Sequence, residues 1–285
     1  MDAIPPSAIV QHHQADLIIV GGTPGGLMTA IAAARRGQSA IILERTAHLG
    51  GLPANGLGAT DIATRGVAAG LFKEFTTRLR DFYRAKYGPD SEQLKICSDG
   101  YHFEPSIGEK ILLEMLGECP SVTVLTRRQF DSQKEHVQQE GREIHSFQAL
   151  NLETGAIENF TAKVFIDATY EGDLAAAAGV PFSTRREGFA DYHEPMAGRV
   201  YQRWGHAHEI GEGSTFEGDD TIQAYNFRLC LTDRPENRVT IAKPPGYNRE
   251  EYASLAEDLK LDRMPGVHVR EREWDGIGRI RFVQV

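Results

Sequence analysis

The chain has 285 residues, of which 41% are hydrophobic and 25% charged, a balance that predicts a packed core and excludes wholesale disorder. Its formal net charge of −9 argues against a general nucleic-acid binder, whose phosphate contacts need clustered lysine and arginine. Three widely spaced cysteines (Cys97, Cys119 and Cys230), no visible secretory signal and no apolar run of about 20 residues predict a cytoplasmic protein with reduced thiols and no membrane contact.

The first predicted elements form a strand, a loop, a helix and a second strand. Residues 16–20 (DLIIV) are a short apolar run that stops at glycine, which is typical of a buried parallel strand. Residues 24–36 then show helical spacing, with Pro24 in the first turn and Gly37 just beyond the end. A second apolar run, residues 40–44 (AIILE), ends in an acid. This order indicates a βαβ unit and hence an α/β fold around a parallel sheet.

The remaining segments predict further helices and strands, among them a short Ala-rich helix within residues 171–180 and a helix near residues 248–260. The other helices are expected near residues 66–84 and from Ser106, and the strands at 122–125, 144–152, 156–161 and 164–169. The middle two strands, joined across residues 153–155, form an antiparallel layer added to the parallel sheet. Residues 131–143 are polar and predict an exposed loop. We expect two domains, residues 15–182 and 183–285, because periodicity weakens after the first.

The loop after the first strand carries the clearest motif. It runs Gly21-Gly22-Thr23-Pro24-Gly25-Gly26 and follows the G-x-G-x-x-G pattern, with Thr23 at the middle glycine position. Gly21 permits the tight turn out of the strand, and Gly26 lets the helix lie close to it. The helix N-terminus offers amides and partial positive charge to a pyrophosphate. The Thr23 hydroxyl is a candidate donor to that phosphate.

Glu44 ends the second strand, roughly 20 residues beyond the loop, where dinucleotide sites place a ribose-binding acid. Its carboxylate is suited to accept hydrogen bonds from the ribose hydroxyls of an adenosine, and its charge disfavours a 2′-phosphate. A glycine-rich turn without a ligand is the alternative. Strand, helix and acid in the correct order together favour the dinucleotide site.

Several spaced segments resemble a family of FAD-dependent oxidoreductases in the glutathione-reductase-like flavoprotein group, some of which are labelled xanthan-lyase-like. The segments are DLIIVGGTPGGLMTAIAAARRG, ILER, HLGGLPANGLGATD, FEPSIGEKIL, VFIDATYEGDLAAAAGV and QAYNFRLCLT, between residues 15 and 260. Loops in this family often read GGTP or GGTS, so Thr23 agrees with the family. The resemblance implies FAD as the cofactor. It also implies a Rossmann-like FAD-binding domain over residues 15–182 and a partial substrate or cap region over residues 183–285.

The resemblance further implies which residues hold FAD. The glycine loop would hold the pyrophosphate, Glu44 the adenosine ribose, and residues 128–130 would lie beside the adenine, chiefly through their backbone. The implied cofactor-binding residues are Gly21, Gly22, Thr23, Pro24, Gly25, Gly26, Glu44, Arg45, Gly50, Gly51, Phe130, Ala168, Thr169 and Asp173.

The C-terminal segment departs from the family. Its members usually continue into a second FAD-binding segment near the flavin ring, whereas residues 270–285 (REREWDGIGRIRFVQV) match no such segment. We therefore expect a shortened flavoprotein in which the adenosine half of FAD has its site. No residue is assigned as the catalytic acid or base.

Two other groups of residues are candidate sites. His193, His206 and His208 lie near acids, but solvated loop histidines are favoured over a metal site, and no metal is expected. Asn226 and Arg228 could face a flavin pocket, although a strand packed on the core explains their pattern better.

These patterns favour an FAD-dependent oxidoreductase that transfers a hydride from a small organic substrate to flavin, with no nucleic-acid or membrane partner. An NAD-dependent dehydrogenase is one alternative, disfavoured by the later segment IDATYEGD. A shortened, non-catalytic remnant that binds nucleotide weakly is the other, motivated by the C-terminus. A disulfide reductase is disfavoured because no CxxxxC follows Gly50 and Gly51.

Overall fold

The computed structural model of the chain describes residues 11–60, 62, 64, 66–131, 133–201, 210–222 and 235–253. The chain divides into two compact units, residues 1–182 and 183–285. Several residues singled out in the sequence lie outside the described residues: His206, His208, Asn226, Arg228, Cys230 and the segment 270–285.

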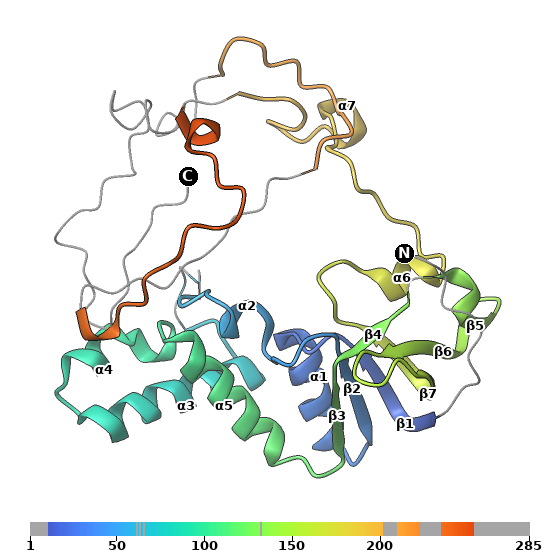
Figure 1. Cartoon of the computed structure of the whole chain (residues 1–285), viewed down its shortest axis with the longest axis horizontal. Helices are drawn as coiled ribbons and strands as arrows, with labels where there is room; N and C mark the ends of the chain where they lie inside the picture. Colours follow the sequence, from blue (N-terminus) through green and yellow to red (C-terminus); the bar gives the residue numbers. More distant parts are fainter. Residues whose placement is uncertain are drawn as a thin grey trace. The chain divides into compact units, whose positions relative to one another are not determined.

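The first unit is built on a seven-stranded sheet of order β3-β2-β1-β7-β6-β4, with β5 beside β6 (Figure 1). The strands are β1 Gln11–Val20, β2 Ala40–Glu44, β3 Val122–Thr126, β4 Arg128–Phe130, β5 Val137–Glu140, β6 Glu143–Asn151 and β7 Ile157–Asp167. Strands β3, β2, β1 and β7 pair in parallel, whereas β4, β5 and β7 pair antiparallel with β6. The predicted parallel sheet with an added antiparallel layer is confirmed.

Helices cover one face of the parallel strands and the antiparallel strands cover the other (Figure 1). Because side chains alternate along a strand, Ile19 and Ile42 face the helix side while Ile18 and Leu43 face the antiparallel layer. The helices of this unit are α1 Pro24–Ala34, α2 Gly51–Ala54, α3 Gly70–Tyr87, α4 Glu92–Ile96, α5 Pro105–Gly117 and α6 Asp173–Ala177, with short 3-10 turns η1 Ser98–Gly100 and η2 Lys134–His136. No helix among the described residues is long and apolar enough to cross a bilayer.

Two expectations about the strands were wrong. The segments 156–161 and 164–169 were predicted as separate strands but form the single strand β7, which pairs with β1 from Glu158 to Asp167. The polar segment 131–143 was predicted as a loop but contains β5, an edge strand on which only Val137 is buried. An edge strand with polar, exposed side chains has no alternating apolar pattern by which a sequence would reveal it.

The second unit has short elements within the described residues: α7 Phe189–Tyr192, η3 Pro235–Asn237 and η4 Arg249–Tyr252. Arg186 and Asp219 pair through their backbones. The guanidinium groups of Arg186 and Arg199 lie 3.2 and 3.3 Å from the Asp219 carboxylate. These ion pairs connect the beginning of the unit to the segment around residue 219.

Candidate dinucleotide site at the carboxyl edge of the sheet

Three parallel strands end side by side at one edge of the sheet. Val20, the last residue of β1, lies beside Leu43 of β2 and Asp167 of β7. The loops that follow these strands contain most of the site residues expected from the sequence. Ligands of open α/β sheets bind outside the carboxyl ends of the strands, and this edge is therefore the candidate site.

Close contacts at the start of the glycine loop exclude side chains. Gly21 has a φ of 108°, and a Cβ on it would lie 2.6 Å from the carbonyl oxygen of Ala168. A Cβ on Gly26 would overlap the carbonyl oxygen of Gly21. These two contacts let α1 begin directly against the strands, which brings its N-terminus to the edge of the sheet.

The Thr23 hydroxyl has a different contact from the predicted one. It donates to the carbonyl oxygen of Ala168 at 2.7 Å and accepts from the amide of Gly26 at 3.4 Å. A hydroxyl carries one proton, and in this structure Thr23 donates it in a hydrogen bond to the Ala168 carbonyl oxygen. In this structure Thr23 caps α1 and joins the loop to the end of β7, and its donation to a phosphate stays a prediction.

The backbone of the loop fits a diphosphate. Within the described residues, the amides of Thr23 and Gly25 donate to no acceptor. A Cβ on Gly25 would meet only the Thr23 hydroxyl, at 3.8 Å, so the space above it is open. These amides lie at the positive end of an 11-residue helix and are the donors that an anionic diphosphate satisfies.

Glu44 joins the glycine loop to the turn after β2. Its Oε2 accepts from the Gly22 amide at 2.9 Å, and its Oε1 accepts from the Thr46 amide at 2.7 Å. A carboxylate offers about four acceptor positions, so both oxygens retain capacity for hydroxyl donors. The carboxylate is therefore fixed in place at the strand end where a ribose is expected.

The segment with Gly50 and Gly51 passes against the glycine loop. Gly50 has a φ of 97°, and its amide donates to the carbonyl oxygen of Gly22 at 2.7 Å. A Cβ on Gly51 would overlap the Tyr170 hydroxyl, which accepts from the Leu52 amide at 2.8 Å. This segment therefore lies against the glycine loop, and its predicted contact with the cofactor stays a prediction. The Tyr170 contact across it was not foreseen.

Exposed side chains link the same two loops. The guanidinium group of Arg45 lies 3.4 Å from the carboxylate of Glu171. Arg45 thus places a cation beside the edge that the diphosphate amides define.

The segment after β7 is held by Asp167. Its Oδ1 accepts from the amide and the hydroxyl of Thr169, and its Oδ2 accepts from the Ala175 amide. The Thr169 hydroxyl in turn accepts from the amide of Gly172, just before α6 begins at Asp173. Thr169 therefore shapes this turn, and Ala168 faces the glycine loop through its backbone.

The predicted adenine segment lies beside Glu44. Thr126, at the end of β3, is the register partner of Glu44. Phe130 is 7% exposed and packs edge-on against Phe147, with ring centroids 5.2 Å apart. Its side chain belongs to the core between the layers, which leaves only its backbone for a ligand.

Glu158 is the residue that sequence reasoning missed. It is a carboxylate only 1% exposed, within the antiparallel layer. Its position alternates in phase with buried Phe160, and an acid in phase with a core residue is the signal that would have marked it.

His193 is the one described residue of the three candidate histidines. It ends α7 with a φ of 57°, and its ring lies against Phe189. In the described part of the chain, no three potential ligands gather into a metal-binding group.

The sheet order, the glycine-bounded helix start and the acid at the end of β2 define a Rossmann-like dinucleotide-binding protein. Residues 16–280 match the family described as FAD dependent oxidoreductase. The chain belongs to this family, whose cofactor is FAD. No curated protein matches the sequence.

Solved structures that resemble the chain are larger proteins. The myxobacterial chondrochloren halogenase CndH, a variant of FAD-dependent halogenases, is 20% identical over 55% of this chain and 37% of its own, with a TM-score of 0.39. The anhydrotetracycline hydroxylase OxyS from Streptomyces rimosus is 17% identical over 60% of this chain and 35% of its own, with a TM-score of 0.42. The glycerol-3-phosphate dehydrogenase from Bacillus halodurans, complexed with FAD, is 12% identical over 58% and 36%, with a TM-score of 0.40. The aligned part of the chain therefore covers little more than a third of each of these proteins.

Proposed function

We propose that this chain binds FAD at the carboxyl edge of its sheet and transfers a hydride from a small organic substrate to the flavin. The observation that carries the proposal is the pair of amides on Thr23 and Gly25. They have no acceptor among the described residues and lie beside a carboxylate fixed at the end of β2. Membership of the FAD-dependent oxidoreductase family supports FAD over a nicotinamide cofactor.

Each part of the site has one task in this proposal. The loop amides donate to the pyrophosphate, Glu44 accepts from the ribose hydroxyls, and Arg45 adds a nearby positive charge. Bound FAD supplies the hydride acceptor, and the protein positions it. We assign no residue as the catalytic acid or base, and we propose residues 183–285 as the substrate or cap region.

The proposed surroundings of the protein follow from its chemistry. Cys119 is a free, buried thiol, and the three cysteines of the sequence are widely spaced, which supports a reducing compartment such as the cytoplasm. The acidic net charge of −9 supports a small-molecule substrate rather than nucleic acid.

The test is a titration of the purified chain with FAD, followed by the visible absorbance and fluorescence of the flavin. We expect saturable binding of FAD and no comparable binding of NAD. A matched Glu44→Gln variant should bind FAD less tightly, because it loses the charged acceptor. A chain that remains colourless and binds neither FAD nor ADP would refute the proposal.

Anaerobic reduction separates an enzyme from a binding protein. Loaded chain, mixed with a panel of small organic hydride donors, should lose its flavin absorbance with at least one of them. Tight FAD binding without reduction by any donor would instead favour the non-catalytic alternative.

A further inference from the structure

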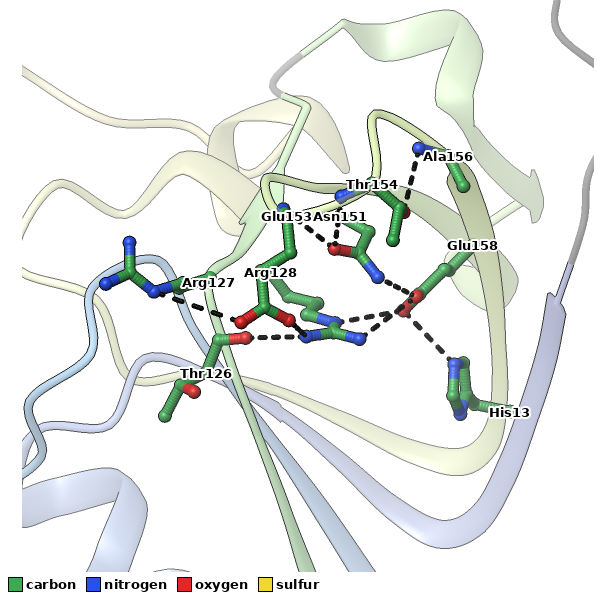
Figure 2. Close-up of polar contacts among 9 residues, drawn as sticks. All are labelled: His13, Thr126, Arg127, Arg128, Asn151, Glu153, Thr154, Ala156 and Glu158. Carbon is green, nitrogen blue, oxygen red and sulfur yellow. Dashed lines mark hydrogen bonds and ion pairs between the residues drawn. The ribbon is translucent and has the colours of Figure 1, made fainter.

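The antiparallel layer contains a buried carboxylate surrounded by polar groups from distant segments. Figure 2 shows Glu158 with three partners pointing toward it, namely His13, Arg128 and Asn151. Arg128 donates from Nε to Oε2 and from Nη2 to Oε1, both at 3.3 Å. The Asn151 amide donates to Oε1 at 2.8 Å, and the His13 Nε2 lies 3.1 Å from Oε2.

A carboxylate at this depth is retained only with such partners. The free energy needed to remove an ionised carboxylate from water is far larger than the free energy gained by burying an apolar side chain. Charged hydrogen-bond donors must therefore replace the lost water. Burial by itself raises the pKa of Glu158, but the hydrogen bonds from Arg128 and Asn151 outweigh it and hold that pKa below its usual range. Glu158 is therefore an anion that fixes Arg128, whose side chain is itself only 14% exposed.

Arg128, held in place by Glu158, also binds the end of β3. Its Nη1 donates to the carbonyl oxygen of Thr126 at 2.9 Å and also to the exposed carboxylate of Glu153 at 3.0 Å (Figure 2). Between them Arg127 has a φ of 55°, a left-handed conformation that is unfavourable for a residue with a side chain. The network of Glu158 and Arg128 thus stabilises the turn over residues 126–128.

That turn is adjacent to the ribose end of the proposed site. Thr126 lies beside Glu44 in the sheet register. The Arg127 amide donates to the Thr46 carbonyl oxygen at 3.0 Å, and the Thr46 amide donates to Glu44. In the strand order β3-β2-β1, the glycine loop follows β1, Glu44 ends β2 and Thr126 ends β3. The end of β3 therefore lies on the side of Glu44 that is away from the glycine loop. A dinucleotide with its pyrophosphate on the loop and its ribose on Glu44 would extend its base toward this turn.

We propose that Glu158 is a positioning residue for the adenosine half of FAD: it orients Arg128 and, through Arg128, holds the turn at residues 126–128 against which the base lies. This role rests on the proposed FAD site. It requires no contact between Glu158 and the cofactor.

The experiment measures the affinity of ADP and of FAD for Glu158→Gln and Arg128→Lys. ADP carries the adenosine and both phosphates but no flavin, so an effect on the adenosine half appears equally with both ligands. We expect each variant to bind both ligands about tenfold more weakly than the unmodified chain. A ratio of that size corresponds to the loss of about one hydrogen bond to a charged group. Because Glu158 acts through Arg128, the double variant should bind no more weakly than the weaker single variant.

Glu74→Gln is the matched control for a general loss of stability. Glu74 is bound by Arg35 and Arg78 in the helical layer, so the variant removes a paired carboxylate from the same unit without touching the turn. It should keep its ADP affinity. Glu153→Gln removes the exposed partner of Arg128 and should weaken ADP binding by less than Glu158→Gln.

Thermal unfolding of each chain without ligand accompanies every titration. A Glu158→Gln variant that is folded at the titration temperature and binds ADP as tightly as the unmodified chain overturns the inference, and so do additive effects in the double variant. If Glu158→Gln does not fold, Arg128→Lys decides the question by the same criterion. An unmodified chain that binds neither ADP nor FAD contradicts the proposed function itself.

Discussion

The glycine loop follows the end of β1, whereas Glu158 lies at the start of β7 and is connected to the end of β3 through Arg128, and the two regions are built from different materials. The loop is made of backbone: amides at the start of α1, a carbonyl oxygen from β7 and glycines that leave no side chain between them. The network is made of side chains from β1, β4, β6 and β7, gathered on one carboxylate. One Cβ would disturb the loop, whereas a change of charge would disturb the network.

The comparison shows how a single site can depend on two kinds of interaction. A backbone cradle tolerates little change in shape, because the contacting atoms are themselves part of the strands. A buried ionic network tolerates some change in shape but not the loss of one partner, which leaves the others with unmatched charges. Substitutions in the two regions should therefore fail in different ways.

Gly26→Ala should have the largest effect. Its Cβ would overlap the Gly21 carbonyl oxygen, which cannot move without displacing the end of β1. We expect a loss of about 2 kcal/mol or more in the free energy of unfolding, together with loss of FAD binding. Denaturant titration and FAD titration measure the two effects.

Gly25→Ala is the control for that variant. Its Cβ would meet nothing closer than the Thr23 hydroxyl at 3.8 Å, and its amide is kept. The stability of the ligand-free chain should stay near that of the unmodified chain. Equal damage from the two alanines would show that the contact with Gly21 is not the cause.

Thr23→Val should have an intermediate effect. Valine keeps the shape of threonine but removes both the cap on the Gly26 amide and the bond to the Ala168 carbonyl oxygen. We expect about 1 kcal/mol less stability in the ligand-free chain, along with weaker FAD binding. Thr23→Ser, which keeps the hydroxyl, should recover both.

The measurement on the ligand-free chain is decisive for Thr23. A hydroxyl that acts only on phosphate would affect FAD affinity and leave the unfolding of the ligand-free chain unchanged. That result would restore the phosphate contact first expected from the sequence and contradict the tie to Ala168.

The predictable part of this molecule is the part encoded by neighbouring residues. The first strand, the loop, α1 and β2 follow one another in the chain. The spacing of Gly21, Pro24 and Glu44 is therefore enough to predict the βαβ unit. The family resemblance then supplied Gly50, Gly51 and the segment after β7. The structure places these residues at one edge of the sheet.

The remaining features depend on partners far apart in sequence. The Thr23 hydroxyl finds Ala168 only because β1 and β7 pair in the sheet, and no local pattern reports that pairing. The single strand β7 is predicted as two because polar Lys163 interrupts its apolar pattern. Glu158 was visible only as an acid in phase with Phe160, and its partners required the fold.

The ion pairs of Glu74 with Arg35 and Arg78 give the smallest predicted effect. Because Glu74 is more exposed than Glu158, comparing the two carboxylates shows the effect of burial. In the helical layer, hydrogen bonds from Arg35 and then Arg78 outweigh partial burial and hold the pKa of Glu74 at about 2, below the ordinary 4.5. A carboxyl whose pKa is lower in the folded chain stabilises the fold fully above its unfolded pKa and loses that contribution as the pH falls. Its contribution should therefore fade between about pH 4.5 and about pH 2.

Glu74→Gln should cost no more than about 1 kcal/mol near neutral pH, because solvent screens a pair with 28% of the carboxylate side chain exposed. Acid titrations of unfolding in low and high salt compare it with Glu158→Gln. Added salt should erase most of the difference between Glu74→Gln and the unmodified chain, while leaving the larger cost of Glu158→Gln nearly intact, because buried pairs are screened much less. Equal salt sensitivity in the two variants would mean that water reaches Glu158, and the distinction between the buried network and a surface ion pair would then fail.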